Sequence, residues 1–225
     1  MKKILINFFR NFFRNIFFIL YGKIKYDGKL SDLKEVKLYE LDTINQNNFI
    51  YKVFEIKNGR IYGDTIEYLG VISNNVLVPN ANYQKVDGII GTDDQNIVLK
   101  IGTPRLKKSF NGTLLSLAQD ASSLNYSHWL LDILPRIKIC EEKHLIDKID
   151  YFLVTDLKYK FQKQTLQLLN VNIENVYSNK NFRHIEASKL LVTSHPWHRE
   201  GLIHDEMHKI PEWIIEWLKE KFISK

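Results

Sequence analysis

Four polar side chains in one short segment are spaced so that they could carry out proton transfer. Asn125, His128, Asp132 and Arg136 are separated by three, four and four residues. On an α-helix this spacing places all four on one stripe. A histidine and a carboxylate within one turn could act together as a general base, because the unperturbed pKa of histidine is about 6.5.

The same stripe also fits two structural interpretations. A polar stripe on a helix is commonly a solvated face, and a His–Asp pair four residues apart can be a surface pair worth roughly a few tenths of a kcal/mol. Pro135 also interrupts the helical pattern, because proline removes a backbone hydrogen bond and kinks a helix. Arg136 could therefore lie on a second, displaced helical piece. Spacing alone leaves these interpretations open.

The elements around the segment predict an α/β unit. The residues between the polar positions are mainly Trp, Leu and Ile, which is typical of a helix buried on most sides. Its polar stripe must then find partners or line a cleft. We expect this helix to run to Lys143. A buried strand over residues 112–118 precedes it, and the continuous apolar run Tyr151–Thr155 is typical of a central parallel strand. A helix over Lys160–Leu169 and a strand over Ser188–Thr193 complete the pattern of a right-handed parallel unit.

Residues 36–100 read as short antiparallel strands joined by turns. Asn58-Gly59 is a strong hairpin signal, and Asn74-Asn75 is a weaker one. Residues 91–96 indicate a further turn. The basic segment Pro104–Ser109 is interpreted as a solvated linker. A final helix is expected after Pro211.

The first 25 residues form an apolar segment with interspersed positive charges. Arg10 and Arg14 interrupt the run of Phe and Ile well short of the roughly 18 uncharged residues that a spanning helix needs, and no small-residue cleavage site follows. We therefore expect residues 1–20 to form an amphipathic helix in the plane of an anionic membrane surface. The alternative is a helix that packs on the protein's own core or on another subunit.

Composition restricts the remaining possibilities. With 225 residues and 44% hydrophobic side chains the chain can form a sizeable core. A net charge of +6 suits an anionic membrane, a phosphorylated substrate or nucleic acid. Nucleic acid is not expected as a partner, because the sequence has no zinc-finger, RNP or P-loop pattern. Cys140 is the single cysteine, which is compatible with a cytosolic location, and we expect it in the core.

Histidines are concentrated near the C-terminal end, at His195, His198, His204 and His208. His204 and His208 are four residues apart, a spacing that can bind zinc on one helical face. The order of an HEXXH motif is absent, because Asp205 follows His204. No third ligand is evident. We therefore interpret these residues as polar surface histidines and expect no metal site.

The segment NYSHWLLDILPR, residues 125–136, resembles the signature of glycosyltransferase family 61, a group of inverting sugar transferases. In bacteria this family is associated with capsular and other surface polysaccharides. The pattern is an Asn-Tyr-x-His-Trp-Leu-x-Asp block followed by Leu-Pro-Arg. In this chain the matching positions are His128, Trp129, Asp132, Leu134, Pro135 and Arg136. The resemblance covers roughly residues 50–220, including the β-rich lead-in and the strand–helix–strand that follows the motif.

The resemblance implies transfer of a sugar from a nucleotide-sugar to a glycan or lipid-linked acceptor at the cytosolic membrane face. His128 and Asp132 are then the catalytic candidates, and either could be the general base. Asn125, Trp129 and Arg136 are substrate-binding candidates. Asn125 could also cap the helix, and Arg136 could pair with Asp132 or with an acidic substrate group. No cofactor or metal is implied besides the nucleotide-sugar.

The implied fold class is α/β and has three parts. These are a membrane-surface segment (1–25), a β-rich lead-in (26–110) and a Rossmann-like, acceptor-side half of a GT-B enzyme (111–225). The family's His-Gly-Ala-Gly-type motif and a Gly-rich phosphate loop are not found in the sequence. The C-terminal half is therefore expected to be absent, with a separately encoded half as a possible partner. We expect the chain alone to show neither sugar transfer nor tight nucleotide-sugar binding.

Two other hypotheses remain. The chain could be a non-catalytic remnant or split subunit that binds glycan or a partner domain. It could also be a structural protein of the membrane surface, which only the N-terminal segment supports.

Overall fold

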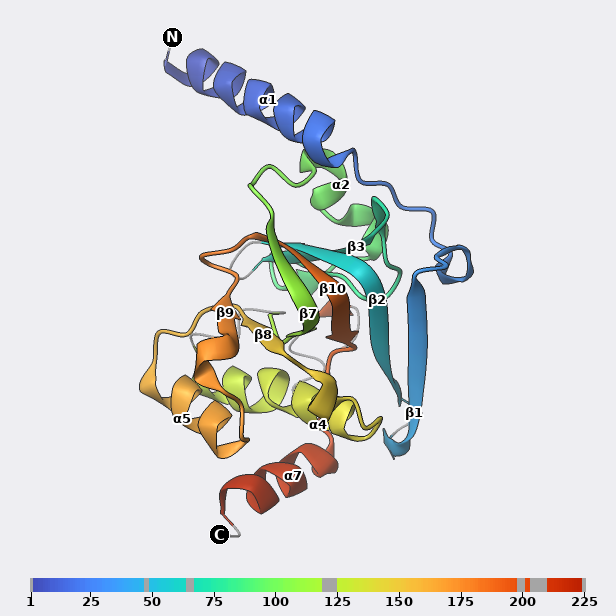
Figure 1. The fold of residues 1–225 in the computed structure, drawn as a ribbon, viewed down its shortest axis with the longest axis vertical. Coiled ribbons are helices and arrows are strands. Elements are labelled where there is room, and N and C mark those ends of the chain that lie inside the picture. The colour runs from blue at the N-terminus through green and yellow to red at the C-terminus, as the bar shows by residue number, and fades with distance from the viewer. Residues whose placement is uncertain are drawn as a thin grey trace.

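The computed structural model describes residues 2–46, 49–63, 67–118, 125–197, 201–202 and 210–223. The described elements form a mixed α/β structure around a large mixed sheet (Figure 1). In chain order they are α1 (Lys2–Tyr21), η1 (Leu30–Asp32), β1 (Val36–Gln46), β2 (Phe49–Gly63), β3 (Tyr68–Ser73), β4 (Val76–Leu77), β5 (Tyr83–Val86), β6 (Ile89–Ile90), η2 (Asp93–Gln95), α2 (Val98–Ile101), β7 (Lys108–Ser116), α3 (Tyr126–His128), η4 (Trp129–Ile133), α4 (Pro135–Glu141), η5 (Ile146–Lys148), β8 (Tyr151–Val154), α5 (Lys160–Leu168), η6 (Ile173–Asn175), β9 (Val176–Ser178), β10 (His184–Thr193), β11 (Gly201–Leu202) and α7 (Glu212–Phe222).

The strands follow the order β11-β6-β5-β3-β2-β10-β7-β8-β9, with β1 beside β2 and β4 beside β3. Strand β10 pairs antiparallel with β2 along its length and parallel with β7, while β7, β8 and β9 are parallel to one another. The parallel strands predicted at Tyr151–Thr155 and Ser188–Thr193 are confirmed. Residues on both sides of the expected boundary at residue 110 contribute to this one sheet.

The hairpin predicted at Asn58-Gly59 is wrong. Strand β2 continues through both residues as one 15-residue strand. Asn58 has a φ of 49° and marks the point where β2 changes its neighbour, from β1 up to Ile56 to β3 from Arg60. A Cβ atom on Gly59 would lie 2.7 Å from Cβ of Leu190. The glycine therefore allows close approach of another element rather than a chain reversal.

Two other turns reverse the chain. The hairpin predicted at Asn74-Asn75 is confirmed, with φ values of 47° and 66° between β3 and β4. A second tight turn, at Asp87-Gly88 between β5 and β6, has φ values of 51° and 81°. Positive φ at both central positions matches the twist of antiparallel strands, which explains the choice of Asn, Asp and Gly. The turn expected over residues 91–96 contains the short helix η2.

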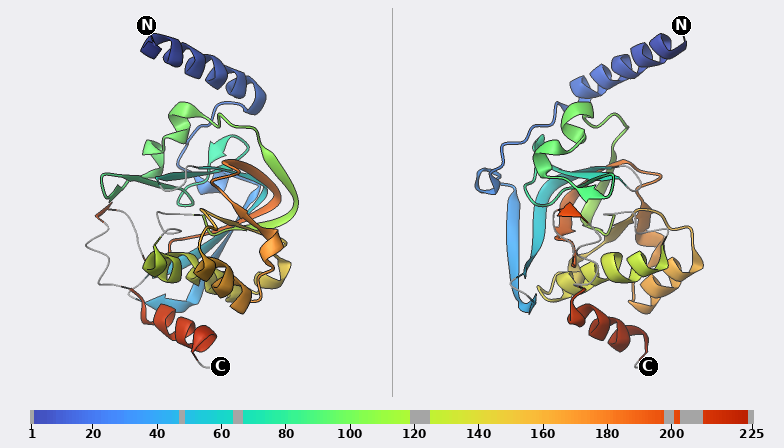
Figure 2. Two further views of the ribbon diagram at one scale, coloured as in Figure 1. Left: turned by 90° about the vertical axis from the view of Figure 1, so that its left-hand side faces the viewer. Right: turned by 180° about the vertical axis from the view of Figure 1, so that it is seen from behind.

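The sheet separates two apolar clusters. Leu115, Val154 and Leu191 point to the face that packs against the α3–α4 segment, α5 and α7. The alternating positions Leu114 and Val192 point to the opposite face, where they meet residues of β3 and β5. This alternation follows from the two-residue period of a strand. Figure 2 shows α4, α5 and α7 gathered on one side of the sheet and toward one end of the molecule.

Helix α1 projects from the other end of the molecule and is attached through its C-terminal turn (Figure 1). The ring of Phe18 packs so closely on Gly102 that a Cβ atom there would clash with it. The backbone N–H of Lys107 donates to the hydroxyl of Tyr21 at 3.2 Å. The rings of Tyr21 and His184 pack edge to face, with their centroids 4.7 Å apart. Among the described helices none is long and apolar enough to cross a membrane.

His184 is a buried histidine beside this attachment. Its Nδ1 atom lies 3.1 Å from the carbonyl oxygen of Arg105. Burial, together with the positive charges of Arg60 and Lys107, lowers the pKa of His184 to about 4, although the bond to the carbonyl opposes this shift. The folded protein therefore holds a neutral His184 under conditions in which an unfolded chain would protonate it.

Acid should destabilise the protein through His184. Its native pKa lies below the unfolded value of about 6.5, so its contribution is fully present above pH ~6.5 and is lost as pH falls toward 4. The expected loss in the free energy of unfolding is about 3 kcal/mol. Urea unfolding between pH 7 and pH 4 should show a shallower pH dependence for His184→Asn than for the native chain. His144→Asn, at an exposed turn with a φ of 53°, is the matched control. Equal pH dependence in both variants would exclude His184 as the source.

Candidate functional site

The motif residues 125–136 form one continuous helical run. Asn125 caps it, because its Oδ1 atom accepts from the backbone N–H of Ser127 at 3.0 Å and from the Ser127 hydroxyl at 2.7 Å. The capping role considered for Asn125 is therefore confirmed. The run then continues from α3 through the π-helical segment η4 into α4.

The π-helical segment explains how the chain accommodates Pro135. The N–H of Leu134 donates to the carbonyl oxygen of Trp129, five residues earlier, at 3.1 Å. Proline cannot donate to the preceding turn and its ring clashes with the carbonyl four residues before it, so a wider turn relieves the conflict. Nε of Arg136 donates to the carbonyl oxygen of Asp132 at 2.9 Å. The helix therefore bulges at Pro135 and continues.

A buried carboxylate orients His128. Asp132 is 0% exposed, and its Oδ2 atom lies 2.7 Å from Nδ1 of His128. Its other oxygen accepts from Nε1–H of Trp197 at 2.5 Å. Because a carboxylate only accepts, the hydrogen of the neutral imidazole belongs on Nδ1 and the basic lone pair on Nε2. The side chain of His128 is 33% exposed, so it links the buried carboxylate to solvent.

Arg136 lies in the interior at the end of β10. It is 0% exposed, and its Nη1 atom donates to the carbonyl oxygen and hydroxyl of Thr193 at 3.3 and 3.1 Å and to the carbonyl oxygen of Ser194 at 3.2 Å. These bonds attach α4 to the carboxyl end of β10. The guanidinium group therefore holds the backbone next to Trp197 in place.

Replacing Arg136 should loosen this connection. Lysine keeps the charge but cannot reproduce the planar fork, so Arg136→Lys should lower the free energy of unfolding by about 2 kcal/mol, the value of one or two lost hydrogen bonds. Urea denaturation at neutral pH measures this change. Lys148→Arg, on the exposed surface, is the control and should have little effect. A variant as stable as the native chain would show that the three contacts to Thr193 and Ser194 contribute nothing.

Trp129 does not face the same side as His128. Its ring is 0% exposed, and its Nε1–H donates to the hydroxyl of Thr165 on α5 at 2.8 Å. In this structure the side chain anchors the motif to α5. A direct contact between Trp129 and a substrate would need a rearrangement of the core.

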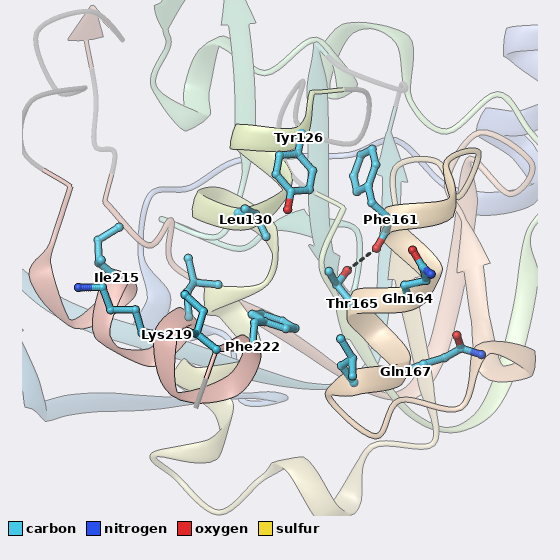
Figure 3. A pocket seen from close by; sticks show the side chains of 12 residues that line it. Tyr126, Leu130, Phe161, Gln164, Thr165, Gln167, Ile215, Lys219 and Phe222 are labelled. Atoms are coloured by element: carbon cyan, nitrogen blue, oxygen red, sulfur yellow. Dashed lines mark hydrogen bonds between the residues drawn. The ribbon is translucent and has the colours of Figure 1, made fainter. Parts of the chain in front are cut away.

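A pocket of about 870 Å³ lies on the side of the motif helix that faces away from His128; Figure 3 shows the residues that line it. Tyr126 and Leu130 form one wall, and residues of α5 and α7 form the others. Tyr126 is two residues before His128, and residues two apart on a helix do not share a face. The amide groups of Gln164 and Gln167 point away from its centre in Figure 3. This mostly apolar pocket is therefore separate from the His128–Asp132 pair.

The His128–Asp132 pair lies at the point where the order of the parallel strands reverses, between β7 and β10. The parallel strands have the order β10-β7-β8-β9, so the chain moves outward from β7 to β9 and then returns to the other side of β7. In open α/β sheets, ligands bind beside the carboxyl ends of the two strands at such a point. Asp132 and Arg136 reach the carboxyl end of β10 through Trp197 and Thr193. The arrangement can therefore present a basic imidazole at a position that suits ligand binding.

Sequence reasoning missed Trp197, Thr193 and Ser194. These residues lie within or beside the segment SHPWH, whose histidines are the more reactive residue type and the more obvious candidates for a site. The available signal was their position directly after a buried strand, where an indole N–H or a free carbonyl can meet a site residue. Among these histidines the structure describes His195, whose Nδ1 atom accepts from the N–H of Trp197 at 3.3 Å.

His204 and His208, whose spacing can bind zinc, lie outside the described residues. Within the described part of the chain, no group of three or more His, Cys, Asp or Glu side chains could hold a metal ion. Cys140 is fully buried, as expected, and burial raises the pKa of its thiol to about 12. A thiol held in its neutral form is a weak nucleophile, so Cys140 belongs to the core.

Comparisons of the chain with protein-family models, with curated proteins and with solved structures find no match. The resemblance to glycosyltransferase family 61 therefore rests on the motif residues and their flanks.

Proposed function

We propose that this chain provides the acceptor-side part of an inverting glycosyltransferase, with His128 as the general base. One observation supports the proposal above the others: a buried carboxylate orients a partly exposed imidazole within the segment that resembles the family signature. Sequence spacing left the choice between His128 and Asp132 open. The difference in exposure favours His128 as the base and Asp132 as the residue that positions it.

In the proposed reaction, Nε2 of His128 takes the proton of an acceptor hydroxyl. The hydroxyl oxygen attacks the anomeric carbon of the nucleotide-sugar from the face opposite the nucleotide, so the configuration inverts. The bond between that carbon and the diphosphate breaks, and its electron pair leaves with the nucleotide. Asp132 stabilises the imidazolium that forms, in the manner of the carboxylate in a Ser-His-Asp triad.

The Rossmann-like, GT-B assignment is part of the same proposal. Read from β9 to β10, the parallel strands have the order of the first four strands of a doubly wound sheet. The connection from β9 to β10 differs from that pattern, because residues 179–183 contain no helix. We propose that the nucleotide-sugar binds on a second domain and that the acceptor, a glycan or lipid-linked sugar, meets His128 at the cytosolic membrane face.

Acceptor binding by the isolated chain tests this assignment. A glycan array, followed by NMR titration of the histidine side chains, should identify an oligosaccharide that shifts the ring signals of His128. A panel of nucleotide-sugars should show no tight binding. Tight donor binding by this chain would place the donor site here and overturn the division into two parts. Glycan binding that leaves the His128 signals unchanged would favour the non-catalytic alternative, a subunit that binds glycan elsewhere.

A further inference from the structure

The excess positive charge of the whole chain is concentrated at its N-terminal end. The protein has 32 Lys and Arg and 26 Asp and Glu, a net charge of +6. Residues 1–26 contain six Lys and Arg and no acidic residue, so the rest of the chain contains 26 of each sign. The body of the protein is therefore neutral overall, and the cationic character belongs to α1 and the residues that follow it.

Helix α1 turns an apolar stripe away from the body. Phe12, Phe13, Ile19 and Leu20, which we call the outward stripe, are 52%, 53%, 85% and 58% exposed. Phe18 and Tyr21 face the body instead, through Gly102, Lys107 and His184. A contiguous exposed apolar patch is unusual on a monomeric soluble protein and marks an interaction site.

The attachment of α1 fixes the direction of this stripe. Besides the contacts of Phe18 and Tyr21, the N–H of Lys25 donates to the carbonyl oxygen of Asn75 at 2.8 Å, and the N–H of Leu77 donates to that of Lys25 at 2.8 Å. Chain segments on both sides of Gly22 are thus bound to the body. A partner that meets the outward stripe meets this end of the molecule.

We propose that α1 docks on an anionic lipid bilayer and that α5 and α7, with the pocket between them, lie at the end of the body that faces away from the bilayer. Apolar rings beside Lys and Arg are the pattern of an in-plane helix that combines burial in the acyl boundary with attraction to anionic headgroups. Figure 1 places α1 at one end of the molecule and α5 and α7 at the other. The bilayer thus contacts the cationic end, and the pocket beside α7 remains in solvent.

Vesicle co-sedimentation with the full chain tests the docking surface. The probes are vesicles of phosphatidylcholine alone and of phosphatidylcholine with one quarter phosphatidylglycerol. The native chain should bind the anionic vesicles more tightly, and high salt should weaken this binding. The triple variant Phe13→Ser, Ile19→Ser, Leu20→Ser should lose at least about tenfold in affinity. Lys23→Gln with Lys25→Gln should lose about 30-fold at low salt, because each surface charge contributes about fivefold.

The other end of the molecule provides a matched control. Leu168, Ile215 and Ile223 are 48%, 40% and 74% exposed beside the pocket. Their triple replacement by serine removes a similar exposed apolar area and should leave vesicle binding unchanged. If this variant loses binding and the α1 variants keep it, the pocket end faces the bilayer and the proposal is wrong. Light scattering tests the alternative that α1 binds a second copy of the chain. If the native chain does not bind vesicles and the α1 variants convert an oligomer to a monomer, α1 is an interface between copies and the proposal is wrong.

Discussion

Replacing His128 by alanine should lower the rate of sugar transfer by about two to four orders of magnitude, the usual range for loss of a general base. Alanine leaves the acceptor hydroxyl without a group to take its proton. The free energy of unfolding should change by less than about 1 kcal/mol, because the side chain is partly exposed and fills little of the core. Nucleotide release in the presence of acceptor, with the donor-binding domain supplied in trans where required, measures the rate.

Stability measured on the same His128→Ala protein distinguishes chemistry from structure. If the pair with Asp132 only ties the helix to the end of β10, the variant should unfold more easily and the folded fraction should remain fully active. His144→Ala, at an exposed turn, controls for the loss of a histidine. Full activity in His128→Ala would remove this residue from the mechanism.

The spacing of polar residues was sufficient to predict the central contact of the site. His128 and Asp132 are one helical turn apart in sequence, and they are hydrogen-bonded in the structure. The predicted contact between His128 and Asp132 forms although the helix contains a π-helical turn. The bond from the N–H of Leu134 to the carbonyl oxygen of Trp129 accommodates the one extra residue of that turn. Continuous apolar runs likewise predicted β7, β8 and β10, since strands buried on both faces lack polar alternation.

Features that depend on distant parts of the chain could not be predicted. Asn58-Gly59 carries the local signature of a hairpin, but β10 pairs with β2 across it and keeps the strand extended. The contact of Trp197 with Asp132 joins residues 65 positions apart, and no local pattern encodes it. Trp129 illustrates the opposite difficulty: its place in the motif suggests a substrate contact, while its bond to Thr165 on α5 places it in the core.

Replacing Asp132 by asparagine should lower the rate of sugar transfer by about three to four orders of magnitude and leave the protein folded. An asparagine oxygen can still accept from the indole N–H of Trp197. Its NH2 group would then face Nδ1 of His128, which must become the acceptor. The ring hydrogen moves to Nε2, the atom that should take the acceptor proton. The equivalent change in a Ser-His-Asp triad lowers kcat about 10⁴-fold for this reason.

Nitrogen NMR of the His128 ring provides a test of this exchange of tautomers that needs no substrate. The native protein should show the form with hydrogen on Nδ1, and Asp132→Asn should show the form with hydrogen on Nε2. Asp132→Ala offers the structural contrast. It leaves the buried indole N–H of Trp197 without its acceptor and should lower the free energy of unfolding by about 1–3 kcal/mol. A folded Asp132→Asn protein with the native tautomer and full activity would show that the carboxylate neither orients the base nor stabilises its charged form.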